Sequence, residues 1–241
     1  MFNNSAYRDI EAPETKNLEK TDGVFSLDTI SDQFEKALKL LQEESPQRVM
    51  TVGGSCGIDA APVSYLNSLY KGNLAVVWFD AHGDLNTPES SPSGHFHGMV
   101  LRTLLGEGPD RYCKSIERPL NARQVFLAGV RDLDISEKYY IESSNIPICE
   151  VNSHLANLVN QSGFSNVYIH IDVDVINPDD FMDALMPTKG GPTCEQLGTC
   201  ISEINEQLNI VGLSIVEYCG EHEGSTKKVV QMLELSGIKS Q

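Results

Sequence analysis

The sequence predicts an α/β fold in which helices cover both faces of a mostly parallel central sheet. Apolar runs of strand length alternate along the chain with segments of helical spacing, which is typical of such sheets. The apolar runs are hydrophobic at consecutive positions, as strands buried on both faces are. In addition, each acidic or glycine-rich motif directly follows an apolar run, where parallel sheets bind their ligands.

The first half of the chain is expected to contribute three helices. Ile30, Phe34 and Leu38 are apolar residues at helical spacing, and Pro62 falls near the first turn of a later helix, where proline is tolerated. Two apolar runs between these helices have the length of strands. The predicted order is helix 27–41, strand 49–52, helix 58–70, strand 74–79, loop 84–95 and helix 98–105.

The second half continues the alternation. Ser136 is expected to cap a helix, and Thr193 with Gln196 forms a capping-box pattern. The predicted order is strand 124–129, a helix after Ser136, strand 146–149, a helix around 155–159, strand 167–173, helix 193–208, strand 211–216 and helix 225–235. The polar segment 1–22 is expected to be irregular or the remnant of a shortened N-terminus, and residues 1–241 are expected to form a single domain.

Composition narrows the classes of function. The net charge of −16 argues against nucleic acid as a partner, no window has the apolar length of a membrane span, and residues 1–18 are too polar for a signal peptide. The six cysteines are scattered without a CxxC pair, which is typical of reduced thiols. We therefore expect a cytoplasmic protein without nucleic-acid or membrane partners.

The first motif that carries chemistry lies directly after strand 74–79. It consists of Asp80, His82 and Asp84, and on extended backbone the positions i, i+2 and i+4 point to the same side. Two carboxylates and an imidazole would then share one small volume, where the carboxylates repel each other unless a cation compensates them. Mn²⁺, Zn²⁺ and Fe²⁺ suit this ligand set, although a surface turn can have the same pattern.

Two further motifs follow strands in the same way. His170, Asp172 and Asp174 share one face of an alternating strand, and beside the first motif they favour a metal site over an exposed sheet edge protected by charges. We interpret His170 as a neighbour of the ligands or a packed strand residue, not as a ligand. The turn 53–57, GGSCG, permits a close backbone approach, but alone it is more typical of a plain turn.

Together the three motifs resemble the ureohydrolases, the arginase and agmatinase family of dinuclear manganese hydrolases. That family carries GGDHS, DAHxD and DxD in this order, and the resemblance covers about residues 49–217. It implies a three-layer, arginase-like α/β/α fold, two Mn²⁺ ions per chain and a homo-oligomer, either a trimer or a hexamer. By position it implies the metal ligands Asp80, His82, Asp84, Asp172, Asp174 and Cys56.

Cys56 departs from the family, whose ligand at this position is a histidine, and Ser55 stands where the family usually has aspartate. As a thiolate, Cys56 would favour Zn²⁺ or Fe²⁺ over Mn²⁺. Acidic surroundings favour the neutral thiol because they raise its pKa, and the nearby cation would then be held weakly. A third interpretation is that Cys56 only packs beside the site.

The segments that distinguish arginases from agmatinases also have counterparts here. DLNTP at 84–88 and SGHFHG at 93–98 resemble the arginase patterns DINTP and SGNLHG, which hold the substrate α-carboxylate. His95 replaces the second asparagine of that pattern. The segment RDLD at 131–134, with Glu137 three positions further on, resembles the arginase segment whose second aspartate contacts the α-amine. The resemblance thus implies substrate contacts for Asn86, Ser93, His95, Asp134 and Glu137.

The resemblance implies three catalytic residues. His97 would give a proton to the leaving amine, for which imidazole has a suitable pKa. Glu217 would pair with the guanidinium group through a charge-assisted bidentate hydrogen bond, and Asp84 would act beside the cations. The implied protein is an arginase-like ureohydrolase that acts on linear amidine C–N bonds, with a small guanidino substrate, most directly L-arginine, converted into ornithine and urea.

Two alternatives stay open at this point. A related hydrolase would act on agmatine, formiminoglutamate or another guanidino compound, but Asn86 and Ser93 favour a substrate with an α-carboxylate. A metal-poor pseudoenzyme would instead bind a small guanidino ligand or a protein partner, and Ser55 with Cys56 favours this interpretation. The single-zinc deacetylases are related by fold but lack the paired carboxylates.

Overall fold

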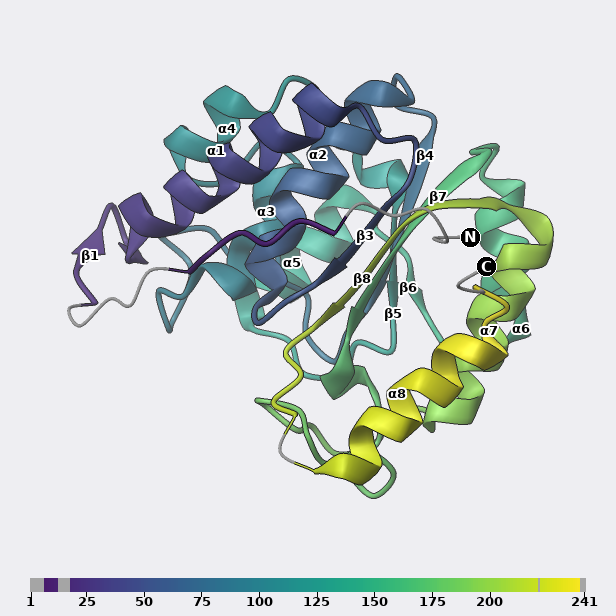
Figure 1. Cartoon of the computed structure of the whole chain (residues 1–241). Helices are drawn as coiled ribbons and strands as arrows, with labels where there is room; N and C mark the ends of the chain where they lie inside the picture. The colour runs from purple at the N-terminus through teal and green to yellow at the C-terminus, as the bar shows by residue number, and fades with distance from the viewer. Residues whose placement is uncertain (1–6, 13–17, 221, 239–241) are drawn as a thin grey trace.

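The computed structural model describes residues 7–12, 18–220 and 222–238 (Figure 1). Its central sheet has six strands in the order β3-β8-β7-β4-β5-β6. The bounds are β3 Val49–Val52, β4 Leu74–Phe79, β5 Val125–Ala128, β6 Ile148–Cys149, β7 Asn166–Asp172 and β8 Asn209–Val216. Every pairing between neighbours is parallel, so the predicted mostly parallel sheet is confirmed.

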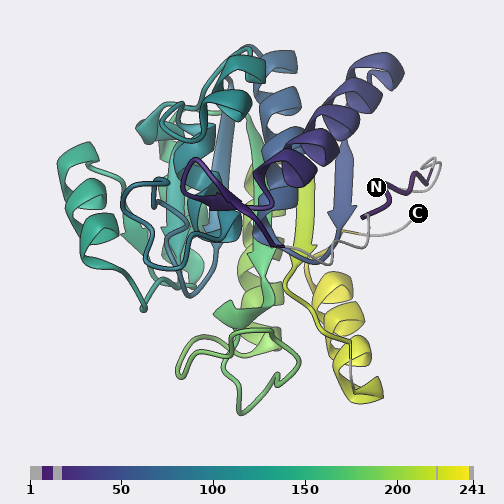
Figure 2. The ribbon, with the colours of Figure 1, turned by 90° about the vertical axis from the view of Figure 1, so that its left-hand side faces the viewer.

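Helices cover both faces of the sheet and complete the three predicted layers (Figures 1 and 2). The first layer consists of α1 Leu27–Glu44, α2 Ala60–Leu69, α3 Val100–Leu104, α4 Asp110–Ser115 and α5 Ile135–Ser144. The second consists of α6 Ser153–Gln161, α7 Cys194–Gln207 and α8 Glu223–Leu235. Within the described residues, none of these helices has the length and apolar content needed to cross a membrane.

Strand β4 shows why the strands are hydrophobic at consecutive positions. Val76 and Trp78 pack into the core beneath the first helix layer, whereas Val77 and Phe79 pack into the core beneath the second. Successive side chains of a strand point to opposite faces, and in β4 both faces are buried along its whole length. The sheet therefore separates two apolar cores and holds the carboxyl ends of its strands in fixed positions.

The helix after β5 begins differently from the prediction. Asp134, not Ser136, is its N-cap residue, and the backbone N–H of Asp134 donates to Oε2 of Glu137 over 2.9 Å, as in a capping box. The hydroxyl of Ser136 donates instead to Oδ1 of Asn86 over 2.7 Å. The predicted capping of this helix by Ser136 is therefore wrong, because aspartate two positions earlier provides the cap.

Two elements of the structure had not been predicted. A short hairpin pairs β1 Lys20–Thr21 with β2 Val24–Phe25, so the expected irregular segment 1–22 ends in a strand; residues 1–6 and 13–17 of it lie outside the described residues. Helix α4 is short and polar, but its Tyr112 ring stacks between Phe34 and Phe96, with ring centroids 4.5 and 4.3 Å away. One buried aromatic side chain thus anchors a helix that has no clear periodicity.

Candidate metal centre

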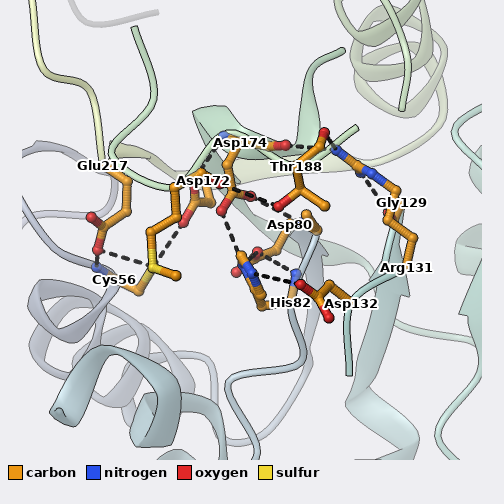
Figure 3. A network of polar contacts seen from close by, with 12 residues as sticks. Cys56, Asp80, His82, Gly129, Arg131, Asp132, Asp172, Asp174, Thr188 and Glu217 are labelled. Carbon is orange, nitrogen blue, oxygen red and sulfur yellow. Dashed lines mark hydrogen bonds and ion pairs between the residues drawn. The ribbon is translucent and has the colours of Figure 1, made fainter. Parts of the chain in front are cut away.

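The predicted ligands come from loops that meet at one edge of the sheet. Asp80 directly follows β4, Asp172 is the last residue of β7, and Cys56 begins a 3₁₀ turn shortly after β3. Glu217 directly follows β8. Strands β3, β8, β7 and β4 are consecutive neighbours in a parallel sheet, so their carboxyl ends bring these four residues together (Figure 3).

The ligand atoms of these residues fall into three overlapping groups. In each group, one ligand atom per residue lies within 4.8 Å of the others. The groups are Cys56 with Asp80, Asp84 and His170; Cys56 with Asp172 and Glu217; and Asp80 with His82 and Asp174. The structure therefore brings together all six residues that the sequence indicated as metal ligands, and adds His170 and Glu217 to them.

The backbone of the first motif is a loop, not the extended segment that the spacing argument assumed. The N–H of His82 donates to Oδ1 of Asp80 over 2.7 Å. Asp84 has a φ of 53°, a left-handed conformation that is uncommon for residues with a side chain. Its carbonyl oxygen accepts the N–H groups of Leu101 and Arg102 at 3.0 and 3.2 Å. The side chains converge because these hydrogen bonds fix the loop.

The second motif departs from the prediction in a similar way. Strand β7 ends at Asp172, and Asp174 lies in the 3₁₀ turn η4, Val173–Val175. The N–H of Asp174 donates to Oδ1 of Asp172 over 2.8 Å, and Oδ1 of Asp174 accepts the N–H of Ala81 over 3.1 Å. Asp172 and Asp174 do not share a strand face, but backbone N–H groups hold both carboxylates at the site.

His82 lies between two of these carboxylates. Its Nδ1 atom is 2.9 Å from Oδ2 of Asp174 and 3.4 Å from Oδ1 of Asp80. Burial lowers the pKa of His82, but the hydrogen bonds to Asp174 and Asp80 outweigh this effect and raise the pKa to about 11. The cluster of carboxylates thus favours a positive charge at this position strongly enough to hold an extra proton on the imidazole.

Two carboxylates of the cluster resist ionisation. Burial, and then the charge of Asp80, raises the pKa of both Asp84 and Asp172 well above the ordinary value. Oδ2 of Asp84 is buried and has no hydrogen-bond partner among the described residues. Divalent cations would remove the repulsion and satisfy this atom, and carboxylate and imidazole ligands suit first-row divalent metals. The residues present therefore fit bound cations.

Cys56 is buried and protonated in this environment. Its Sγ atom donates to Oδ2 of Asp172 over 3.2 Å, and its backbone N–H donates to Oε1 of Glu217 over 3.1 Å. Burial raises the pKa of the thiol well above its ordinary value, and the charges of Asp84 and Asp172 raise it further. This favours the neutral thiol among the interpretations of Cys56, and the turn itself is closed by Ser55, whose Oγ accepts the N–H of Gly57.

Glu217 is held over the glycine-rich turn. Its φ is 60°, and its backbone N–H donates to the carbonyl of Gly54 over 2.6 Å. Burial raises the pKa of its carboxyl group, although the hydrogen bonds from Cys56 partly oppose this shift. The side chain reaches the cluster from the end of β8 and lies beside Cys56 (Figure 3).

Arg131 stabilises the other side of the site, and sequence reasoning missed this role. Its guanidinium group donates to four carbonyl oxygens: those of Gly129 at 2.9 Å, Asp174 at 2.8 Å, Thr188 at 2.9 Å and Lys189 at 3.0 Å. Figure 3 shows three of these acceptors. Arg131 thereby ties the long loop after β7, which projects beyond the sheet in Figure 2, to the end of β5.

Asn86 and Asp134, both predicted to bind substrate, are bonded to each other. Nδ2 of Asn86 donates to Oδ2 of Asp134 over 2.8 Å, and Oδ1 of Asn86 accepts the hydroxyl groups of Ser90 and Ser136 at 2.9 and 2.7 Å. These contacts attach loop 84–95 to the first turn of α5. The two residues are therefore adjacent, as a shared role at one end of a substrate requires.

Glu137 uses both carboxylate oxygens within the chain. Oε1 accepts the N–H of Leu85 over 3.0 Å, and Oε2 accepts the N–H of Asp134 over 2.9 Å. The side chain is buried, and each of its oxygens already accepts one backbone N–H. Its position favours holding Asp134 and the loop in place.

The remaining predicted residues lie at the end of loop 84–95. Ser93 and His95 are exposed, and Oγ of Ser93 accepts the N–H of His95 over 3.2 Å. The rings of His95 and His97 have centroids 5.9 Å apart. Burial and the neighbouring His95 lower the pKa of His97, while the charge of Asp80 raises it. His97 is half-buried, and it lies near enough to Asp80 for the charge of that carboxylate to affect its pKa.

Known proteins resemble this chain along most of its length. A sequence model described as "Arginase family" matches residues 3–233. An arginase from Staphylococcus aureus (strain COL) is 30% identical over 226 residues, which cover 87% of this chain and 74% of that protein. The solved arginase of Entamoeba histolytica, in complex with L-ornithine, has a TM-score of 0.84 at 24% identity and covers 94% of this chain and 82% of its own.

A formimidoylglutamase of Bacillus subtilis shares the fold as well, with a TM-score of 0.70 at 20% identity over 90% of this chain and 69% of that chain. Structural likeness at these identities concerns the fold alone, whereas the family match extends over nearly the whole sequence. The chain belongs to the arginase family and is a metal-binding hydrolase of the ureohydrolase type.

Proposed function

We propose that the protein hydrolyses a guanidino C–N bond and that its substrate is L-arginine, which yields ornithine and urea. The observation that carries the proposal is the convergence of two sequence motifs on one buried cluster. The ligand atoms of Asp80, His82 and Asp174 lie within 4.8 Å of one another, and Asp80 also belongs to the group of Cys56 and Asp84. Such a cluster supports two neighbouring cations that share a carboxylate.

The residues present would hold two divalent cations, which the family resemblance suggests are Mn²⁺. Asp80, His82 and Asp174 would hold one, and Cys56, Asp80 and Asp84 the other, and Asp172 would add a carboxylate near Cys56. When bound, such cations supply Lewis acidity, which lowers the pKa of a water molecule held between them. The negative charge of the carboxylates also repels anions from the site and attracts cationic groups.

The side chains around the cluster are suited to a guanidinium substrate. Glu217 faces the cluster from the end of β8, and a carboxylate binds a guanidinium group through two parallel charge-assisted hydrogen bonds. His97 is half-buried, and burial lowers the pKa of its imidazole, so at neutral pH it can accept a proton and pass it to the leaving amine. Glu217 would thus orient the substrate, and His97 would move the proton.

The far end of the substrate would meet loop 84–95. The hydrogen bond of 2.8 Å between Asn86 and Asp134 places an amide beside a carboxylate, which can contact the α-carboxylate and the α-amine respectively. Ser93 is exposed nearby on the same loop. Agmatine has no α-carboxylate, so these contacts favour arginine.

A substrate panel tests the proposal. Purified protein loaded with Mn²⁺ is expected to release urea from L-arginine faster than from agmatine, and to release little formamide from formiminoglutamate, the second candidate that the formimidoylglutamase fold supports. Ser93→Ala should raise KM for arginine and leave KM for agmatine unchanged. Faster turnover of agmatine or of formiminoglutamate would identify that compound, and not arginine, as the substrate.

The pseudoenzyme remains a measurable outcome of the same panel. It would release product from none of the three compounds, and elemental analysis would find no divalent metal. The predicted trimer or hexamer and the cytoplasmic location stay predictions. Sedimentation of the purified protein checks the first, and fractionation of the source cells checks the second.

A further inference from the structure

His170 occupies the middle of the sheet, and the function proposed above gives it no role. Its side chain is fully buried on β7, and its ring stacks on that of Trp78 in β4, with centroids 3.4 Å apart. Nδ1 lies 2.6 Å from Oδ2 of Asp59, which belongs to the same 3₁₀ turn as Cys56, η1 Cys56–Asp59. The other ring nitrogen, Nε2, has no hydrogen-bond partner among the described residues.

Few buried polar side-chain atoms lack a partner among the described residues, and two of them belong to residues of one candidate metal-binding group. Five such atoms occur in the part of the chain that the structure describes, of which three are serine hydroxyls. The other two are Nε2 of His170 and Oδ2 of Asp84, and both residues belong to the group that includes Cys56 and Asp80. Each such atom costs roughly 1–3 kcal/mol, and a ligand bound by this group of residues would offset that cost.

We propose that His170 binds, through Nε2, the divalent cation that lies beside Cys56, Asp80 and Asp84. The imidazole of β7 would then replace the nitrogen ligand that the family resemblance places at position 56. The inference rests on the proposed function only in that it requires a cation at this end of the cluster. It changes the ligand set there to one thiol, one imidazole and two carboxylates.

Asp59 is built to orient His170 for this role. It is fully buried, and its carboxylate accepts hydrogen bonds from the hydroxyl groups of Tyr168, over 3.1 Å, and Ser214. When Nδ1–H of His170 also donates to Asp59, the lone pair of Nε2 is directed to the opposite side, where Oδ2 of Asp80 lies 3.8 Å away. Histidines that bind metals commonly donate their other N–H to a carboxylate in this way.

The two cation positions would consequently differ in character. Thiolate and imidazole ligands favour borderline cations such as Zn²⁺ and Fe²⁺, whereas carboxylate-rich sets suit Mn²⁺, and a cation that binds Cys56 would displace the proton of its thiol. The position beside Cys56 and His170 is therefore expected to prefer Zn²⁺ to Mn²⁺. The position formed by Asp80, His82 and Asp174 has two carboxylates and one imidazole and should prefer Mn²⁺ more than the first does.

Calorimetric titration of EDTA-treated protein with ZnCl₂, without substrate, tests the proposal. The variant His170→Asn keeps an N–H near the position of Nδ1, which can still donate to Asp59, but it lacks Nε2. We expect it to lose more than about a hundredfold in affinity for one of two Zn²⁺ ions, and Asp59→Asn to lose about tenfold to a hundredfold. His154→Asn changes an exposed histidine of α6 and should leave both affinities unchanged.

A role of His170 in packing alone would give a different result. His170→Asn would then lower the melting temperature of the EDTA-treated protein while both Zn²⁺ affinities stayed at the parental values, and this result would overturn the proposal. Tighter Zn²⁺ binding by His170→Asn would overturn the proposal as well. That result is expected if His170 is a charged partner of Asp59 and Asp80, because the variant removes a positive charge from the cluster.

If His170→Asn does not fold, X-ray absorption of the zinc-loaded parent still tests the proposal, because it counts the imidazole ligands bound to zinc. Two imidazole ligands per pair of Zn²⁺ ions support the assignment, because His82 can supply only one. A single imidazole per pair overturns it. Neither measurement depends on turnover, so a protein that fails the substrate panel can still support His170 as a ligand, and an active arginine hydrolase can still refute it.

Discussion

The thiol of Cys56 donates a hydrogen bond to the carboxylate of Asp172 over 3.2 Å. A thiol that donates is protonated, and burial together with the charges of Asp84 and Asp172 raises its pKa well above the ordinary value. A cation that binds sulfur must therefore displace this proton, so its affinity is expected to increase with pH. Position 56 thus links metal binding to proton release.

The first prediction follows from this link. Cys56→Ser retains an O–H that can donate to Asp172, but it removes the soft ligand. We expect the ratio of bound Zn²⁺ to bound Mn²⁺ to fall by at least about tenfold, and the Zn²⁺ affinity to depend less on pH. Competition of equal concentrations of both cations, followed by elemental analysis, measures the ratio. An unchanged ratio would mean that Cys56 only packs beside the site.

The second prediction concerns the carboxylate common to two ligand groups, Asp80. Asp80→Ala would remove a ligand from both cations, and Asp172→Ala would remove a carboxylate from the group that includes Cys56. We expect each variant to lose bound metal and to fall in turnover by more than about a hundredfold. Urea release and metal content are measured on the same preparation.

Asp132→Asn is the matched control for these variants. Asp132 also lies near His82, 3.9 Å from its Nε2, but its side chain is 69% exposed. Removing its charge should leave metal content intact and change turnover by less than about twofold. If Asp80→Ala retained turnover after losing its metal, the dinuclear mechanism would have to be abandoned.

The fold could be predicted largely from local patterns. Strand β4 is buried on both faces, so its residues are apolar at every position, and a run of this kind is visible in the sequence. The residues that follow β4 and β7 were correctly expected to meet, because parallel strands end at one edge. The arrangement of these side chains could not be predicted from the sequence, because it depends on the positive φ of Asp84 and on backbone hydrogen bonds.

Sequence reasoning named His170 but missed its partner Asp59 and the role of Arg131, because these contacts act across long separations. Asp59 and His170 are 111 positions apart, and no spacing rule relates them. Arg131 donates to four backbone carbonyls, which are present at every position and give no signal in side-chain patterns. The position of Arg131 just after a predicted strand is a weak indication of such a role, and the resemblance drew attention to Asp134 instead.

The third prediction uses the raised pKa of Asp84. Burial, and then the charges of Asp80 and Asp172, raises this pKa in the folded protein. An acid whose pKa is higher when folded contributes its full stability below its unfolded pKa of about 4 and loses it as the pH rises through the folded value. EDTA-treated protein should therefore lose stability as the pH rises above about 4, because Asp84 ionises more readily in the unfolded chain than in the folded one.

Asp84→Asn removes this penalty and a ligand at once. At about pH 7.5, the EDTA-treated variant should be more stable than the parent by roughly 1–3 kcal/mol in urea denaturation, and the difference should shrink towards about pH 4. Its metal affinity should fall. Asp179→Asn alters an exposed aspartate and should show no difference at either pH. A variant less stable than the parent at pH 7.5 would show that the Asp84 carboxylate stabilises the fold.

The last prediction concerns Glu217. Glu217→Gln keeps an oxygen that can accept the N–H of Cys56, which lies 3.1 Å from Oε1, so the turn should keep its shape. The charge that pairs with a guanidinium group is lost, along with one acceptor. Hydrogen bonds to charged groups contribute about 1.5–3 kcal/mol, so kcat/KM for arginine should fall roughly tenfold to a hundredfold.

The kinetic constants separate this role from metal binding. Glu217 also belongs to a ligand group with Cys56 and Asp172, and a loss of metal would lower kcat at every concentration of added cation. A partner of the guanidinium group instead raises KM and lowers kcat while the metal content of the variant equals that of the parent. Steady-state kinetics with saturating Mn²⁺, together with elemental analysis, distinguishes the two. An unchanged kcat/KM would show that another residue orients the substrate.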